Sequence, residues 1–353
     1  MVRVEFLLLI LILNSNEHNI NETNKAKIFF KKKGETSKKN LLIGSVINYN
    51  WTIIEPFFKS LKQANFKNCD FIIFVGNMTK KTIDKIQSCG VLIHEIPLHI
   101  FKNMKIINYR WKLYADFLQN NKDKYNLVFT ADIRDTIFQQ DLFYFLPNNS
   151  SFLGIALEDC TLSEETNKKW IINAYGEDVH KKIESQRTIC IGTLWGTVDI
   201  FLNFSIIMYE KLSSQLYINN KVIEQAVTNY LIYYEKLFND YLIKSDNKDG
   251  KVMTIGVTKR ENILLDIENN ILNLKGEKAA VIHQYDRKPN IRNLIINKYC
   301  PEIKNLTKNE SHNFLIINKT SLTIISTKYK NNYGLVDLMK RIIEIREFFI
   351  LNI

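Results

Sequence analysis

Two carboxylates at the end of an apolar run are the residues of this chain best suited to chemistry. The run Tyr125-Asn-Leu-Val-Phe-Thr-Ala131 leads directly into Asp132 and, three residues later, Asp135. Such a run indicates a buried strand, and open α/β sheets bind ligands at the carboxyl ends of their strands. Because buried carboxylates are costly without a compensating cation, the pair predicts either a divalent metal site or a loop closed by ion pairs through Arg134.

A histidine at the end of another apolar run offers a third ligand. Ala279-Ala-Val-Ile282 leads into His283, and Lys288 follows in a basic segment where it could bind a phosphate. Carboxylate oxygens together with one imidazole suit Mn²⁺ better than Ca²⁺ or Zn²⁺. A lone histidine in such a position can equally be a satisfied loop or core residue, so both interpretations stay open.

Strand and helix patterns alternate in the segment that leads to the carboxylates. Strands are expected over 41–47, 71–75 and 91–96, and helices over 52–64, 78–88 and 109–118. This β-α-β-α-β order predicts an α/β fold with a mostly parallel sheet flanked by helices and a nucleotide-type crevice. Tyr49 and Trp51, in the loop after the first strand, could stack on a nucleobase, with simple packing as the alternative.

Further elements follow the acidic strand. Strands are expected over 152–157 and 189–196, and helices over 198–212 and 221–238. The first of these strands ends in Glu158-Asp159, a second pair of carboxylates. The next contains Gly192, and a glycine within a strand marks a place where another group approaches the backbone closely. Glu224-Gln225 opens the last helix.

The two ends differ from the middle of the chain. Residues 4–13 are apolar except for Glu5. This run is shorter than the roughly 20 residues of a transmembrane helix but fits a signal peptide or a clipped signal anchor, with an apolar first strand as the alternative. We expect a leader and basic linker over 1–40, a globular domain over 41–300 and a C-terminal extension of loop, strand and helix over 301–353.

The leader predicts entry into the secretory pathway, either to the Golgi or ER lumen or to the outside of the cell, and association with a membrane through the N-terminus. A cytoplasmic location is the alternative. Asn-x-Ser/Thr sequons, which would make the chain a glycoprotein, support secretion only slightly because the sequence is rich in asparagine. They begin at Asn21, Asn77, Asn203, Asn305 and Asn318.

Composition narrows the classes of protein. Hydrophobic residues make up 46% of the 353 residues, enough for a sizeable core. The net charge of +11 suits nucleic acid, an anionic membrane or phosphorylated ligands, but the absence of zinc-finger spacing, an RNP motif or a basic heptad array disfavours nucleic acid. Five cysteines leave at least one thiol free, and Cys69 and Cys89 could bridge if their strands are neighbours.

In their order, these motifs resemble those of GT-A-fold glycosyltransferases that use nucleotide sugars, in particular the branch of glycogenin and the bacterial lipopolysaccharide galactosyltransferases. That pattern has a helix arginine, an Asp-x-Asp strand, a glycine-containing strand, an Asp-Gln helix start and a late His-x-x-Gly…Lys-Pro segment. The matching positions are Arg110, 132–135, Gly192, Glu224-Gln225 and 283–289. The chain departs from the pattern in having Asp-Ile-Arg-Asp, a glutamate at 224 and no glycine after the histidine.

The resemblance implies a metal-dependent hexosyltransferase that moves a sugar from a nucleotide-diphosphate sugar, with UDP expected, to a glycan, protein or lipid. It implies Mn²⁺ or Mg²⁺, because a divalent ion offsets the charge that builds up on the leaving diphosphate. The implied metal ligands are Asp132, Asp135 and His283. The residues expected to bind the nucleotide sugar are Tyr49, Trp51, Arg110, Asp132, Gly192 and Lys288, and those expected at the reacting centre are Glu224, Gln225 and Asp159.

Three other interpretations stay open. A phosphatase of the haloacid dehalogenase type also has acidic residues at a strand end, but it needs Asp-x-Asp-x-Thr, and position 134 is arginine. A catalytically inactive glycan- or nucleotide-binding protein could keep the GT-A-like fold without the metal. A basic nucleic-acid binder would bind DNA or RNA with a steep dependence on salt.

Overall fold

The computed structural model describes residues 38–97, 105–147, 150–214 and 223–302. Apart from 38–40 and 301–302, the expected leader and C-terminal extension lie outside these residues, so the predictions about secretion and membrane association are not tested. None of the helices in the described ranges combines the length and the apolar character that crossing a bilayer requires.

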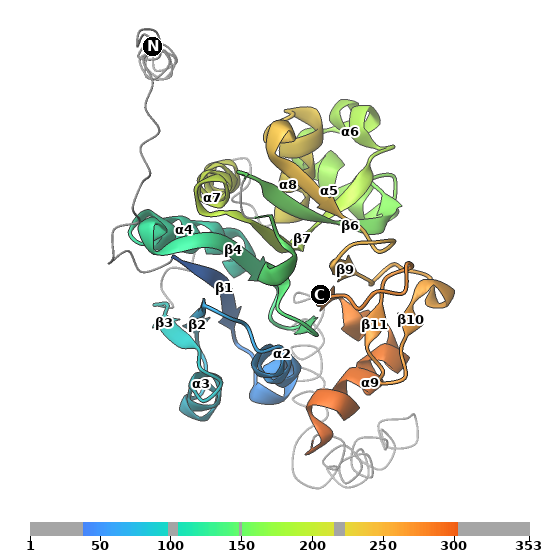
Figure 1. Cartoon of the computed structure of the whole chain (residues 1–353). Helices are drawn as coiled ribbons and strands as arrows, with labels where there is room; N and C mark the ends of the chain where they lie inside the picture. Colours follow the sequence, from blue (N-terminus) through green and yellow to red (C-terminus); the bar gives the residue numbers. More distant parts are fainter. Residues whose placement is uncertain (1–37, 98–104, 148–149, 215–222, 303–353) are drawn as a thin grey trace, which may run out of the picture. The chain divides into compact units, whose positions relative to one another are not determined.

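A seven-stranded sheet forms the centre of the domain, with the strand order β3-β2-β1-β4-β7-β6-β8 (Figure 1). Only β7 runs antiparallel to its neighbours, and the other pairs are parallel. The predicted α/β class with a mostly parallel sheet is therefore confirmed. The strands are β1 (Lys39–Ile47), β2 (Cys69–Gly76), β3 (Leu92–Glu95), β4 (Tyr125–Ala131), β6 (Leu153–Thr161), β7 (Arg187–Thr197) and β8 (Leu242–Ser245).

Helices cover both faces of this sheet, as Figure 1 shows for α4 and α7 on one side and α2 and α3 on the other. In β1, Leu41 and Ile43 are buried in one cluster with residues of α4 and α7. Leu42 and Val46 are buried in a second cluster with residues of α2. A strand buried on both faces reads as an unbroken apolar run, which explains the sequence of β1.

The α-helices of the described ranges are α2 (Trp51–Gln63), α3 (Lys80–Gln87), α4 (Ile106–Gln119), α5 (Glu165–Tyr175), α6 (Glu177–Ile183), α7 (Val198–Ser213), α8 (Glu224–Asn229) and α9 (Pro289–Tyr299). The helix expected over 221–238 is shorter, since α8 passes into a π-helical turn, η5 (Tyr230–Tyr234). Helices α5, α6 and α9 were not predicted. α9 begins with Pro289, a residue favoured in the first turn.

A three-stranded sheet with the order β5-β12-β9 joins segments that are far apart in the sequence. Its strands are β5 (Thr136–Phe138), β12 (Val281–His283) and β9 (Val252–Thr254). His283 pairs with Thr136 on one side and with Thr254 on the other. The pairing brings the strand that carries His283 directly beside the residue that follows Asp135.

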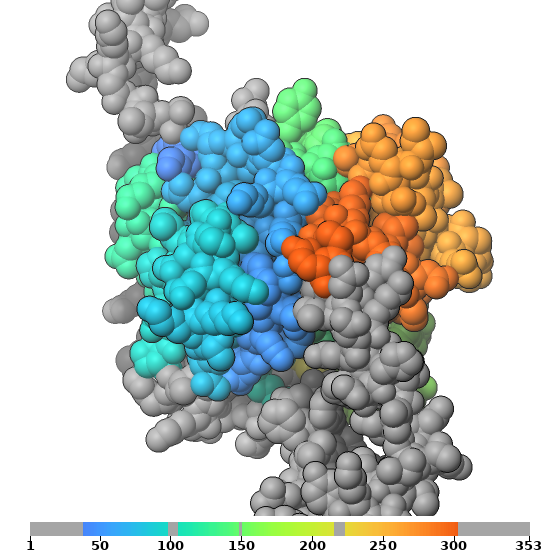
Figure 2. All heavy atoms as spheres, turned by 90° about the horizontal axis from the view of Figure 1, so that it is seen from below, coloured from blue at the N-terminus to red at the C-terminus, as the bar shows by residue number. Residues whose placement is uncertain are grey.

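The remaining short elements lie in the connections. β10 (Leu264–Leu265) and β11 (Ile271–Leu272) form a hairpin. The 3₁₀ turns are η2 (Lys122–Lys124), η3 (Leu142–Phe145), η6 (Asn239–Tyr241), η7 (Arg260–Asn262) and η8 (Tyr285–Arg287). α9 packs against α2 (Figure 2), where Lys59 pairs with Glu302 at 2.9 Å.

Two sequence expectations need correction. The five cysteines, including Cys69 and Cys89, are free in this structure, so that pair forms no bridge. The strand expected to end at residue 157 continues to Thr161, which places Glu158 and Asp159 within β6, where its pairing register with β7 shifts. A strand end that depends on a bulge cannot be located from the apolar pattern alone.

Candidate metal centre

The candidate site lies at the switch point of the large sheet. β1 pairs with β2 on one side and with β4 on the other. The chain therefore adds β2 and β3 on one side of β1 and then continues with β4 on its other side. Open α/β sheets bind ligands outside the carboxyl ends of the strands at such a point. Here these ends carry Tyr49, after β1, and Asp132 to Asp135, after β4.

The four residues from Asp132 to Asp135 form a turn between β4 and β5. The Asp132 N–H donates to the Gly192 carbonyl of β7 at 2.8 Å. Ile133 is buried in the core, whereas the side chain of Arg134 is 46% exposed. Two residues separate the aspartates here, one more than in Asp-x-Asp. The turn accommodates the extra residue because Ile133 points inward while both carboxylates face His283.

His283 brings the three candidate ligands together. Its Nε2 lies 3.4 Å from Asp135 Oδ1 and 3.8 Å from Asp132 Oδ2. One ligand atom from each residue lies within 4.8 Å of the other two. The imidazole is 1% exposed, and its Nε2 has no hydrogen-bond partner among the described residues. Buried polar atoms are normally satisfied, and a divalent cation would satisfy this nitrogen and both carboxylates at once.

The strands behind His283 fix the orientation of its ring. Nδ1 lies 3.4 Å from Cys190 Sγ and 3.5 Å from Thr254 Oγ1. In the tautomer with its proton on Nδ1, the Nδ1–H donates to one of these partners and the lone pair of Nε2 is left for a metal. Metal-bound histidines usually have such a partner. On β7, a Cβ at Gly192 would overlap the imidazole and come within 2.9 Å of Asp132 Oδ2. Glycine is required here because the ring and the carboxylate fill the space of a side chain.

Electrostatics favour a cation at this place. Burial raises the pKa of both aspartates, but Arg110 beside Asp132, and His283 beside both, outweigh it and hold each pKa below its ordinary value. Burial lowers the pKa of His283, yet Cys190 and the carboxylates hold it well above its ordinary value. The ionised carboxylates therefore attract either a proton to His283 or a metal ion in its place.

Arg110 on α4 connects Asp132 to Glu224. Its Nη1 donates to Asp132 Oδ1 at 2.6 Å. Its Nη2 and Nε donate to Glu224 Oε1 and Oε2 at 2.6 and 3.0 Å. Trp111 Nε1 donates to Glu224 Oε2 at 2.7 Å. The side chains of Arg110 and Glu224 are 4% and 6% exposed, and burial raises the pKa of Glu224 to about 7 despite the guanidinium.

Two further predicted residues follow strands of the site. Tyr49, after β1, packs partly buried against the core cluster that contains Ile133, and burial raises the pKa of its hydroxyl. Lys288 is the N-cap residue of α9. Its half-buried side chain has no hydrogen bond or ion pair with any described residue, which leaves the ammonium available to an anion.

Trp51 does not lie in the site. It is the first residue of α2 and is 8% exposed. Its indole stacks on Phe58, with 5.9 Å between the ring centroids, and Lys85 lies over the ring. These contacts favour simple packing, the alternative to stacking on a nucleobase, because an aromatic residue after a strand can also begin the buried face of a helix.

Asp159 and Gln225 belong to separate hydrogen-bond networks. Asp159 accepts from Arg187 at 3.0 Å, Asn247 at 2.8 Å and Thr258 at 2.6 Å. The Gln225 amide donates to an asparagine side chain of α5 at 2.9 Å and is 9% exposed. Within the described ranges, neither residue has a hydrogen bond or ion pair with the three candidate ligands.

Sequence reasoning missed the residues behind the site. Thr254 lies on β9, a strand of only three residues, and Cys190 occupies an apolar strand. Trp111 reads as part of an amphipathic helix. The one usable signal was Gly192, whose place within a strand indicated that another group approaches the backbone there.

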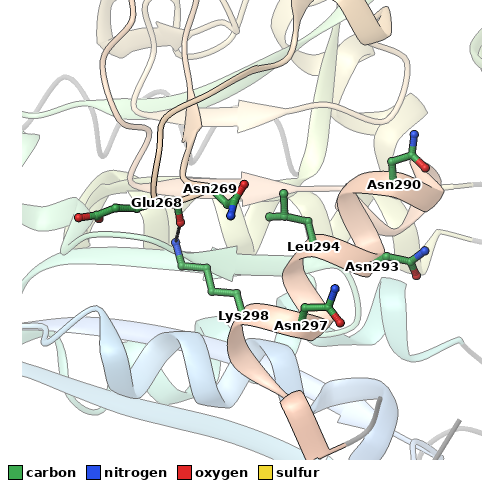
Figure 3. A pocket seen from close by; sticks show the side chains of 7 residues that line it. All are labelled: Glu268, Asn269, Asn290, Asn293, Leu294, Asn297 and Lys298. Atoms are coloured by element: carbon green, nitrogen blue, oxygen red, sulfur yellow. Dashed lines mark hydrogen bonds between the residues drawn. The ribbon is translucent and has the colours of Figure 1, made fainter. Parts of the chain in front are cut away.

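A groove elsewhere on the domain runs between α9 and the turn of the β10–β11 hairpin (Figure 3). Its volume is about 490 Å³, and its lining contains none of the predicted site residues. The lining residues are Glu268, Asn269, Asn290, Asn293, Leu294, Asn297 and Lys298.

Comparisons with known proteins give a limited result. No family model and no curated protein matches the chain. Among solved structures, the chain is similar to an active-site mutant of LgtC, with a TM-score of 0.42, and to the galactosyltransferase LgtC in complex with donor and acceptor sugar analogs, with a TM-score of 0.41. Both are 12% identical and cover 69% of this chain and 86% of theirs. Likeness of this degree concerns the path of the backbone alone, so the function has to be inferred from the site.

Proposed function

We propose that this protein is a metal-dependent glycosyltransferase that moves a sugar from a nucleotide-diphosphate sugar, UDP-linked, to a glycan, protein or lipid acceptor. The observation that carries the proposal is the buried Nε2 of His283, which lacks a hydrogen-bond partner among the described residues and faces Asp132 and Asp135. The location at the switch point of an α/β sheet supports a nucleotide as the ligand.

Asp132, Asp135 and His283 would hold the metal, and the mixture of oxygen and nitrogen ligands favours Mn²⁺, with Mg²⁺ as the second choice. When bound, the ion offsets the negative charge that develops on the leaving diphosphate. Lys288 would contact a phosphate through its unpaired ammonium. Tyr49 would lie against the nucleobase.

Three other predicted site residues would have different roles. Gln225 is the candidate for contact with the sugar, although its amide is bound to α5 in this structure. Gly192 would act by leaving room for His283 and Asp132 rather than by touching the donor. Asp159 is held by three donors, which argues against a place at the reacting centre.

The rival phosphatase chemistry is disfavoured by Arg134. That chemistry needs an acid two residues after its nucleophilic aspartate, and here a guanidinium occupies the position. Arg134 Nη2 lies 3.1 Å from Asp135 and 3.6 Å from Asp286. It therefore binds carboxylates and cannot donate the proton that a phosphatase requires.

A thermal-unfolding screen tests the proposed function. The protein is heated with UDP, GDP and their common sugar conjugates, each with and without Mn²⁺. We expect stabilisation by a uridine nucleotide only when Mn²⁺ is present, by about 2.7 kcal/mol at a hundredfold excess over the Kd. If no nucleotide stabilises the protein with either Mn²⁺ or Mg²⁺, the proposal fails and an inactive protein of this fold is favoured.

A further inference from the structure

Glu224 occupies a place that a sugar-binding carboxylate would not. Its side chain is 6% exposed, and three donors lie within 3.0 Å of its two oxygens. Two of these donors come from Arg110 and one from Trp111, which are adjacent residues on α4. The carboxylate is thus bound on the side that faces the helix, and little of it is left for a ligand.

The geometry of Arg110 links this carboxylate to the metal centre. Its Nε and Nη2 edge binds Glu224 side-on, a bidentate arrangement that fixes the plane of the guanidinium. With the plane fixed, Nη1 points to Asp132 Oδ1 at 2.6 Å. The other oxygen of Asp132, Oδ2, is the one that faces His283 Nε2. Through Arg110, Glu224 is thus connected to the orientation of the Asp132 carboxylate, one oxygen of which faces Arg110 and the other His283.

The charge of Glu224 also affects the charge balance between Arg110 and Asp132. Without Glu224, the buried guanidinium would have Asp132 as its single ionised partner in the hydrogen bonds that the structure describes. A buried cation without compensation is costly, so Arg110 would cancel most of the charge of Asp132. With Glu224 in its ionised form, the guanidinium is neutralised from behind, and Asp132 keeps its negative charge for a cation.

We propose that Glu224 is a positioning residue for the metal centre: as the counter-ion of Arg110, it lets Arg110 orient Asp132 without cancelling the charge that Asp132 offers to the metal. The inference rests on the proposed function and makes it more specific. It replaces the expectation that Glu224 lies at the reacting centre. It also gives a reason for glutamate at this position, since the longer side chain reaches both Arg110 and Trp111.

The test is the affinity for Mn²⁺ alone, measured on the full chain by the loss of the free Mn²⁺ signal in electron paramagnetic resonance. Glu224→Gln keeps the shape of the side chain and removes its charge. We expect its Mn²⁺ affinity to fall by about 10- to 100-fold, the usual loss when the support of a metal ligand is removed. UDP and UDP-glucose, each titrated with Mn²⁺, should then lose affinity by the same factor, because the sugar is not involved.

Two further variants keep the test decisive. Glu55→Gln, on α2, is a matched control, because Glu55 is also buried and paired with a single cation, Lys59; it should bind Mn²⁺ like the wild type. Trp111→Phe removes one donor to Glu224 and keeps an aromatic ring. It should weaken Mn²⁺ binding by less than Glu224→Gln, and it serves as the test if that variant does not fold.

The outcomes separate this inference from the proposed function. If the wild type binds Mn²⁺ and Glu224→Gln binds it equally well, the positioning role is overturned and the metal centre stands. If Glu224→Gln loses affinity only for UDP-glucose and not for UDP, Glu224 contacts the sugar and the inference is also overturned. If the wild type binds neither Mn²⁺ nor Mg²⁺, the metal-dependent function fails, and the positioning role fails with it.

Discussion

Carboxylates follow two apolar runs in this chain, and the structure treats Asp159, after the second run, differently from Asp132 and Asp135, after the first. Asp132 and Asp135 leave a strand end and face a histidine nitrogen that has no hydrogen-bond partner in the described ranges. Asp159, of the second pair, lies within β6 and accepts from a guanidinium, an amide and a hydroxyl. The residue types are nearly the same, but Asp159 accepts hydrogen bonds from three residues, whereas Asp132 and Asp135 face an unsatisfied nitrogen.

The comparison shows what separates a binding site from a structural cluster. A buried or half-buried carboxylate that already receives several hydrogen bonds gains little from a metal ion. A carboxylate that faces another carboxylate and an unsatisfied imidazole gains much from one. A shortage of hydrogen-bond donors, rather than acidity alone, therefore distinguishes the candidate metal centre, and variants of Asp135 and Asp159 should behave differently.

The largest effect is expected from Asp135→Asn. The substitution keeps the size of a side chain that is 3% exposed and removes its charge. Because Asp135 Oδ1 is the carboxylate oxygen closest to His283 Nε2, we expect Mn²⁺-dependent stabilisation by UDP to fall below detection, a loss of more than about 100-fold in metal affinity. Thermal unfolding with Mn²⁺ and UDP measures it.

Asp84→Asn is the matched control for this variant. Asp84 is an exposed aspartate of α3, and the same change of charge there should leave the response to Mn²⁺ and UDP unaltered. If Asp135→Asn still responds like the wild type while it remains folded, Asp135 is not a ligand, and the distinction between the two pairs disappears.

Gly192→Ala should have the next largest effect. The added methyl group would overlap the imidazole of His283, which must then move away from the carboxylates. We expect Mn²⁺ affinity to fall by about tenfold or more, as for the loss of a supporting contact. Gly90→Ala is the control, because Gly90 has a φ of +83° and no neighbour within 4 Å, so it loses stability without touching the site. Equal Mn²⁺ affinities in the two variants would argue against a ligand role for His283.

The candidate ligands could be predicted from the sequence, whereas the residues that hold them in place could not. Asp132, Asp135 and His283 each follow an apolar run, so their places could be inferred from local pattern and the geometry of an open sheet. The partnership of Arg110 with Glu224 joins residues 114 positions apart, and no local pattern reports such a contact. The fold class was predictable for the same reason as the ligands, since long buried strands dominate the sheet.

Short elements explain most of the rest. β5 and β9 have three residues each, too few for a period to be recognised. These strands nevertheless place Thr254 behind His283 and Thr136 beside it. The two alternatives for Trp51 stayed open for a similar reason, because only tertiary packing decides whether an aromatic residue at a strand end turns into the core or toward the crevice.

Substitution of Asp159 should change the stability of the protein and not its metal binding. In Asp159→Asn, the charged acceptor of Arg187, Asn247 and Thr258 becomes a neutral amide. We expect the free energy of unfolding to fall by about 1–3 kcal/mol, with Mn²⁺ affinity within twofold of the wild type. Urea denaturation and Mn²⁺ titration measure the two effects. A variant of normal stability that had lost the donor sugar would instead support the predicted catalytic role of Asp159.

The smallest effect is expected behind the histidine, from Thr254→Val. Valine has nearly the shape of threonine and removes one of the two partners of His283 Nδ1. Cys190 Sγ still lies 3.4 Å from this nitrogen, so we expect a loss of only a few-fold in Mn²⁺ affinity, below the usual range for such partners.

The double variant Cys190→Ala with Thr254→Val decides whether the two partners act as alternatives. If each compensates for the other, the pair of substitutions should weaken Mn²⁺ binding by more than the product of the single effects, because residues that share one partner are not additive. If the double variant instead binds Mn²⁺ like the wild type, the ring is fixed by packing alone, with Gly192 and the strand pairing of β12 determining its position. The backbone would then orient the unsatisfied Nε2, and the candidate metal centre would tolerate substitutions of Cys190 and Thr254 that should weaken it if hydrogen bonds held the ring.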